Sequence, residues 1–108
     1  SGAHRSGTLF FDEIDAGVGG RLGDMNGARL QDLARDRQVI CITHLPQVAG
    51  HGDRHLRVTK RVSGGRTRTE VTELSGPDRV EEIASMIRGD ASRSTTLQLA
   101  REILGDRQ

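Results

Sequence analysis

Residues 9–13 read Leu9-Phe10-Phe11-Asp12-Glu13, an apolar run that stops abruptly at two adjacent acids. Together with Thr8, the run predicts a short buried strand that carries carboxylates at its C-terminal end. Acids in this position can hold Mg²⁺ through one carboxylate and orient an attacking water molecule through the other. Acids usually lie on solvated surfaces, so the pair taken by itself is a weak signal for this chemistry.

A second apolar run lies in residues 38–43 and is followed directly by His44. Continuous runs rich in β-branched residues are typical of parallel strands covered on both faces. Between the two runs, residues 21–35 show a helical spacing of apolar side chains, which Gly23 and Gly27 weaken. A strand, a helix and a second strand predict a parallel βαβ unit. Its carboxyl edge, where open parallel sheets bind ligands, would bring the acid pair and His44 together.

The rest of the chain predicts one hairpin and two helices. After a short helical turn in residues 45–52, apolar and polar residues alternate over 56–71 around a Gly64-Gly65 turn. We expect one helix to begin with a capping box at residues 75–78 and to end at Gly89. A last helix would start at Ser92 or Ser94 and end at Gly105. The expected fold class is α/β: a parallel βαβ core, a β-hairpin and two C-terminal helices.

Composition limits the size and the environment of this domain. Of the 108 residues, 33% are hydrophobic, and the aromatic residues are Phe10 and Phe11. So few aromatic side chains suggest that another segment or another chain completes the core. The single cysteine, Cys41, excludes an intramolecular disulfide, fits a reducing compartment and is expected to fill the core. No signal peptide or membrane-spanning window is evident, so we expect the cytoplasm and no membrane partner.

The net charge of +1 points to no particular partner, but basic residues gather in one segment. Residues 54–69 contain six basic side chains and no acid: Arg54, Arg57, Lys60, Arg61, Arg66 and Arg68. Such a stripe is either a solvated hairpin or a surface that contacts phosphate. It contains no aromatic residue that could stack on bases. His51, Asp53 and His55 lie beside it, but their spacing matches no strong zinc pattern.

Two segments together resemble a known family. Residues 11–20, Phe-Asp-Glu-Ile-Asp-Ala-Gly-Val-Gly-Gly, and residues 41–49, Cys-Ile-Thr-His-Leu-Pro-Gln-Val-Ala, resemble the C-terminal head segment of the RecN family. These are SMC-like ATPases involved in bacterial double-strand break repair. The resemblance runs from about Leu9 to Leu104. It implies one lobe of a P-loop NTPase head of the ABC/SMC type over residues 8–105. Residues 1–7, which are rich in Ser and Gly, are expected to form a flexible segment, and residues 106–108 a tail.

The resemblance also implies roles for particular residues in the hydrolysis of ATP. Asp12 matches the Walker B aspartate that binds Mg²⁺, Glu13 the glutamate that polarises water, and His44 the switch histidine that senses the γ-phosphate. Residues 15–20 match the D-loop, of which Asp15, Ala16 and Gly17 are assigned to the nucleotide site. Many heads end this loop in an aspartate where this chain has Gly19, so the role of that aspartate does not transfer. For Gln47 we expect no more than a polar contact near the nucleotide.

No phosphate-binding loop of the G-x-x-x-x-G-K-[ST] type occurs in the chain. We therefore expect the isolated chain to be inactive. Its expected partners are the N-terminal lobe of the same head, a second head in an ATP-dependent dimer, and DNA through the full-length protein in the bacterial nucleoid.

Two other hypotheses stay open. In the first, Asp12, Glu13 and Asp15 form the metal cluster of a toprim-like phosphotransferase or nuclease. That class expects acids on two different strands, and it leaves His44 unexplained. In the second, the chain is a non-catalytic module that contacts DNA or oligomerises through the basic hairpin at 54–69.

Overall fold

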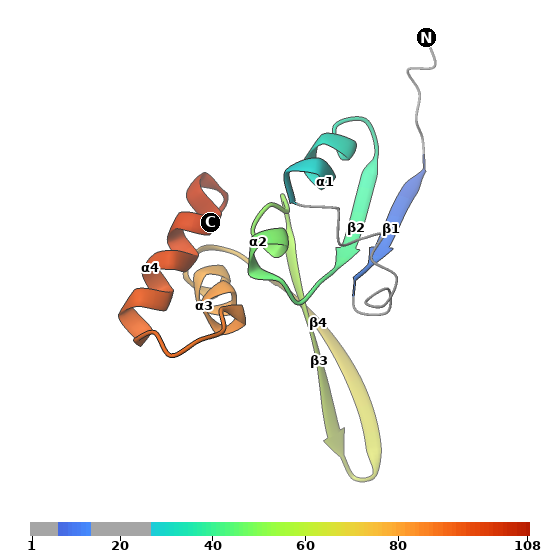
Figure 1. Cartoon of the computed structure of the whole chain (residues 1–108). Helices are drawn as coiled ribbons and strands as arrows, with labels where there is room; N and C mark the ends of the chain where they lie inside the picture. Colours follow the sequence, from blue (N-terminus) through green and yellow to red (C-terminus); the bar gives the residue numbers. More distant parts are fainter. Residues whose placement is uncertain (1–6, 14–26) are drawn as a thin grey trace.

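The computed structural model describes residues 7–13 and 27–108, which form a small α/β domain with two separate sheets (Figure 1). In chain order the elements are β1 (Thr8–Asp12), α1 (Gly27–Leu33), β2 (Gln38–Ile42), α2 (Pro46–Ala49), β3 (His55–Ser63), β4 (Arg66–Leu74), α3 (Gly76–Met86), α4 (Arg93–Leu104) and the 3₁₀ turn η2 (Gly105–Arg107). No helix of the described ranges is long and apolar enough to cross a membrane.

The parallel pair that the sequence predicts is confirmed. Strands β1 and β2 pair in register from Thr8↔Gln38 to Asp12↔Ile42. The expectation that both faces are covered is wrong: Phe10 is 60% exposed, and its partner Ile40 is 41% exposed. The opposite face, which carries Phe11 and Cys41, is half-buried. Side chains alternate along each strand, so a layer on one side of a sheet leaves every second residue in solvent.

Helix α1 is shorter in the described structure than the predicted segment at 21–35, of which residues 21–26 lie outside the described ranges. It begins at Gly27 and ends at Leu33. Gly27 packs directly against His51, and a Cβ atom at Gly27 would overlap the imidazole ring. The glycine that weakens the helical pattern in the sequence therefore permits α1 to approach the segment after α2 closely.

The predicted hairpin is confirmed, and it is longer than expected. Strands β3 and β4 pair antiparallel from His55↔Leu74 to Ser63↔Arg66, and the ribbon extends away from the helices (Figure 1). Gly64 and Gly65 form the turn with φ of 58° and 78°. Both values lie in the left-handed region, as a type I′ hairpin turn requires.

The core lies between α3 and α4. Ile83, Ala100 and Leu104 are completely buried there, with Val80 beside them. These residues recur at helical spacing in both helices, so each helix turns one apolar face toward the other. No aromatic side chain belongs to this cluster of the described residues, which is a small core for a chain of 108 residues.

The ends of the last two helices follow the prediction in part. Ser92 caps α4 by accepting a hydrogen bond from the backbone amide of Thr95 at 3.2 Å, and Gly105 ends the helix with φ of 55°. Ser75 precedes α3, but its side chain makes no capping hydrogen bond, so the predicted capping box is wrong. Gly76 follows with φ of 56°, and this left-handed entry turns the backbone away from the geometry of a capping box. Helix α3 also ends at Met86, before Gly89.

Two arginines connect the C-terminal helices to the segment after α2. Arg79 of α3 is 2% exposed and donates to the carbonyls of Gly52 at 2.7 Å and Arg107 at 2.6 Å. A further bond reaches the carbonyl of Ala49 at 3.2 Å. Arg107 in turn donates to the carbonyl of Gly50 at 2.6 Å. Residues 106–108, expected as a tail, thus include a side chain that is bonded to the body of the domain.

Candidate functional site

The C-terminal ends of β1 and β2 meet at one edge of the parallel sheet. Asp12 pairs with Ile42, and the backbone amide of Glu13 donates to the carbonyl of Ile42 at 2.9 Å. This bond continues the strand pairing by one residue and holds Glu13 beside Thr43. The predicted juxtaposition of the two strand ends is therefore present, because parallel strands in register end at the same edge.

Thr43 is the nearest partner of Glu13 at this edge. Its hydroxyl donates to carboxylate oxygen Oε2 of Glu13, and its Oγ1 accepts a hydrogen bond from the backbone amide of Leu45 at 3.0 Å. The amide can only donate, so the hydroxyl hydrogen is left for the carboxylate. Sequence reasoning did not single out Thr43. A hydroxyl residue at the end of the strand next to the acid pair is the signal that could have identified it.

The two acids influence the cysteine inside the sheet. Burial raises the pKa of the Cys41 thiol to about 11, and the negative charges of Glu13 and then Asp12 add to the shift. Each effect disfavours the thiolate. Cys41 is a free, half-buried cysteine and lies outside the core cluster that α3 and α4 form, so the expectation that it fills the core is not met.

His44 and Gln47 face an open groove on the side of the C-terminal helices. Both residues are exposed, and they line the groove together with Leu45, Pro46, Met86, Ile87, Arg88, Leu99 and Ile103. The backbone carbonyl of Gln47 accepts a hydrogen bond from Nδ1 of His51 at 2.6 Å, which places the His51 proton on Nδ1. His44, the predicted sensor of the γ-phosphate, thus lies on a solvent-accessible surface beside an open groove.

Three of the predicted site residues cannot be placed. Asp15, Ala16 and Gly17 lie outside the described residues. Within residues 7–13 and 27–108, no group of three His, Cys, Asp or Glu side chains gathers in a way that could hold a metal ion. The described part of the chain therefore offers Asp12 and Glu13 as individual oxygen donors.

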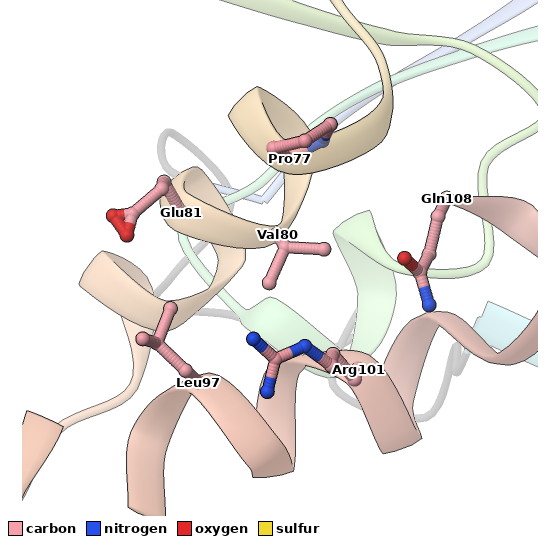
Figure 2. A pocket seen from close by; sticks show the side chains of 6 residues that line it. All are labelled: Pro77, Val80, Glu81, Leu97, Arg101 and Gln108. Carbon is pink, nitrogen blue, oxygen red and sulfur yellow. The ribbon is translucent and has the colours of Figure 1, made fainter. Parts of the chain in front are cut away.

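A second hollow lies between α3 and α4 and contains none of the predicted site residues. Pro77, Val80 and Glu81 line it from α3, and Leu97, Arg101 and Gln108 line it from the last part of the chain (Figure 2). Of the lining side chains, Val80 belongs to the core cluster and Leu97 packs against it. This hollow is a surface depression between two packed helices.

Comparison with known proteins identifies the family. The chain is 45% identical over 98 residues to the DNA repair protein RecN of Treponema pallidum and 46% identical over 97 residues to that of Streptomyces coelicolor. These alignments cover 91% and 90% of the chain. The chain matches a C-terminal fragment of RecN.

RecN of Deinococcus radiodurans is similar as well, with 43% identity over 97 residues. The chain spans 17% of the length of each of these three relatives. No family model matches the chain. The match to RecN confirms the family that the motifs at residues 11–20 and 41–49 predict, and it extends over nearly all of the described structure.

Proposed function

We propose that this chain is the C-terminal lobe of a RecN-like, ATP-hydrolysing head that acts in DNA double-strand break repair. The observation that carries the proposal is the register of β1 and β2. It brings Asp12 and Glu13 to the same carboxyl edge of a parallel sheet as Ile42 and Thr43, the edge where nucleotides bind in open α/β folds, and His44 follows Thr43 directly in the sequence. The similarity to proteins named for DNA repair supports the biological role.

Asp12 would hold Mg²⁺ in this head. Mg²⁺ prefers oxygen ligands, retains several waters, and is usually held by one or two carboxylates together with substrate phosphates. A single carboxylate at the strand end fits that donor set, even though no group of three ligating side chains gathers in the described residues. When bound, the ion would neutralise charge on the β- and γ-phosphates. Asp12 would therefore need the nucleotide and water to complete the coordination.

Glu13 would orient the water that attacks the γ-phosphate. Thr43 donates to Oε2, so Oε1 remains available to accept a hydrogen bond from water. The chain of bonds from the Leu45 amide through Thr43 to Glu13 restricts rotation of the carboxylate. Orienting the attacking water is one of the two ways in which side chains assist phosphoryl transfer, the other being stabilisation of the charge on the phosphate.

His44 would contact the γ-phosphate, and Gln47 would make a polar contact near the nucleotide. Both line one groove beside the strand end, on the two sides of Leu45 and Pro46. Asp15, Ala16 and Gly17 are proposed as the part of the D-loop that reaches the opposite nucleotide site. These roles follow from the resemblance to RecN heads, and the exposure of His44 and Gln47 is compatible with them.

Exposed apolar surfaces support the proposal that an N-terminal lobe completes the head. Phe10, Ile40 and Ile42 are exposed on one face of the parallel sheet, with values from 39% to 60%. Monomeric proteins rarely leave contiguous apolar patches of this kind in solvent. We propose that the N-terminal lobe of the same head, which would supply the phosphate-binding loop, covers this face. A second head and DNA are the further proposed partners of the full-length protein.

The toprim-like alternative finds little support in the described structure. It requires several carboxylates around one metal, and one of the three acids it would use, Asp15, lies outside the described residues. Asp12 and Glu13 are consecutive at a strand end, so their side chains point to opposite sides of the sheet. The ATPase hypothesis uses the two acids separately and is therefore the better match.

The test is Mg²⁺-dependent phosphate release from ATP by the full-length protein. Glu13→Gln is expected to lower kcat about 10²- to 10⁴-fold, the range that general acid–base groups contribute. The same variant should still bind ATP, because the substituted amide keeps the shape of the side chain. Glu102→Gln is the matched control, since Glu102 is exposed on α4, away from the sheet edge.

A Glu13→Gln variant that hydrolyses ATP at the wild-type rate would overturn the assignment of Glu13. Loss of ATP binding in that variant would instead indicate a structural role.

A complementary experiment mixes this chain with the N-terminal lobe. Hydrolysis that requires both lobes would support the proposal of a divided head.

A further inference from the structure

The positive charge of the hairpin is concentrated near its turn. Three of the six basic residues of the stripe have acidic partners. Two of them lie near the base of the hairpin, where Arg54 pairs with Glu73 at 2.8 Å and Arg57 with Glu82 at 3.5 Å. Arg61 pairs with Glu70 at 2.9 Å. The remaining residues, Lys60, Arg66 and Arg68, form no ion pair with any acid of the described ranges. The distal half of the hairpin therefore keeps an excess of positive charge.

The register assigns most of this charge to one face of the ribbon. Residues directly opposite each other in an antiparallel pair share a face, and residues two apart on a strand share it too. Arg61 lies opposite Arg68, and Arg66 lies opposite Ser63 on the same face. We call this set of three arginines, Arg61, Arg66 and Arg68, the arginine face. The other face carries Val58, Val62 and Val71 together with a single unpaired cation, Lys60.

The pairing of Arg61 with Arg68 is unfavourable for the hairpin alone. Like charges directly across a strand pair repel each other and destabilise the pairing. Glu70 offsets one of these charges, and the other two arginines remain uncompensated. The side chain of Arg61 is 75% exposed, and Arg66 and Arg68 are exposed as well. An external polyanion would relieve the repulsion, because it supplies negative charge along the same face.

We propose that the arginine face contacts the phosphate backbone of double-stranded DNA. Alternate residues on a strand are about 7 Å apart, so the three arginines form a short, regular array of cations. Duplex DNA is the densest linear anion that such an array can meet, and arginine binds phosphate well through its planar group of donors. Figure 1 shows the end of the hairpin that carries the turn extending away from α3 and α4.

The choice of duplex DNA rests on the proposed function in DNA repair and on the composition of the ribbon. Single-stranded nucleic acids are usually bound through aromatic side chains that stack on bases. Residues 54–74 contain no Phe, Tyr or Trp. Contacts to phosphate need no such side chain and depend little on sequence. We therefore expect binding that is independent of base sequence and strongly dependent on salt.

The experiment measures the affinity of the full-length protein for a fluorescent 20-base-pair duplex, without nucleotide, from 50 to 200 mM salt. Arg66→Ala combined with Arg68→Ala should weaken binding several-fold. It should also reduce the slope of log affinity against log salt by about 2, roughly 1 for each lost phosphate contact. The matched control combines Arg35→Ala with Arg101→Ala, which removes the same charge from exposed positions outside the hairpin.

A second variant tests the opposite direction. Glu70→Gln removes the acid that pairs with Arg61, so it should tighten duplex binding and steepen the salt slope. A hairpin that is merely damaged by substitution would not gain affinity. Circular dichroism spectra that match the wild type would show that the ribbon is intact.

Three results would overturn the inference. These are an unchanged salt slope in the Arg66/Arg68 variant, an equal loss in the Arg35/Arg101 control, and a larger effect on a single strand than on the duplex. The duplex-binding assay contains no ATP, so its result does not depend on whether the assignment of Glu13 is correct. Failure of the arginine face would likewise leave ATP hydrolysis intact.

Discussion

The hydroxyl of Thr43 donates a hydrogen bond to the carboxylate of Glu13, and this bond joins the ends of two strands that are 30 residues apart in the chain. The Leu45 amide donates to the same hydroxyl. The proposed catalytic carboxylate is therefore held by the residue that directly precedes the proposed sensor, His44. A movement of Thr43 at the end of β2 would therefore shift the Glu13 carboxylate at the end of β1.

Thr43→Val should slow ATP hydrolysis while preserving the shape of the strand. Valine keeps the β-branched side chain but loses the hydroxyl, so Glu13 loses its donor. We expect kcat to fall about tenfold, equivalent to roughly 1.4 kcal/mol, with little change in KM. Thr43→Ser keeps the hydroxyl and should stay near the wild-type rate. Equal rates for the Val and Ser variants would argue against positioning of Glu13 by Thr43.

Cys41 should react slowly with thiol reagents in the folded protein. Its pKa of about 11 leaves little thiolate at pH 8. Because Glu13 and Asp12 contribute to that shift, Glu13→Gln should lower the pKa and speed alkylation by iodoacetamide, with Asp12→Asn having a smaller effect. The rate of alkylation from pH 7 to 10 measures this. Unfolding in urea serves as the control, since all variants should then react alike.

Arg79→Leu should destabilise the domain strongly. The substitution removes the donors for the carbonyls of Gly52 and Arg107, and unsatisfied buried acceptors are costly. We expect the free energy of unfolding to fall by roughly 2–4 kcal/mol, measured by urea denaturation. Arg93→Leu is the matched control, because Arg93 forms an exposed ion pair with Glu81 and should matter little. Similar losses in the two variants would contradict the buried role of Arg79.

Stability should decline as the pH falls below about 6.5, the ordinary pKa of histidine, partly because of His55. Burial lowers the pKa of His55 in the folded state; the charges of Arg79 and Arg57 act in the same direction, and Glu82 opposes them. The unfolded chain therefore binds the proton more readily, and protonation favours unfolding between 6.5 and the lower folded value. Urea midpoints from pH 5 to 8 should show a weaker decline for His55→Gln. An unchanged decline would exclude His55 as its source.

Local patterns in the sequence were sufficient to predict most elements. The acid pair after an apolar run, the Gly64-Gly65 turn and the Ser92 cap each depend on a few neighbouring residues, and each is found where it was expected. The capping box at Ser75 is the exception. Its residue types match the motif, but the left-handed φ of Gly76 changes the path of the chain, and residue type alone does not reveal that geometry.

Burial was harder to predict than secondary structure. The apolar run at residues 38–43 suggested a strand covered on both sides, whereas Ile40 and Ile42 are exposed on one face. The hydrophobicity of a strand indicates that its faces can be buried. It does not indicate which elements of the structure bury each face.

The sequence by itself determined the family, the parallel strand pair and the identity of the candidate residues Asp12, Glu13 and His44, because these depend on residue type and order. Tertiary structure alone decided that Thr43 bonds to Glu13, that Arg79 binds the carbonyls after α2, and that acids pair with both arginines at the base of the hairpin but with only one near its tip. The physical reason is that hydrogen bonds and ion pairs act over a few ångströms. They depend on which distant residues the fold brings within that range, and spacing along the chain does not determine this.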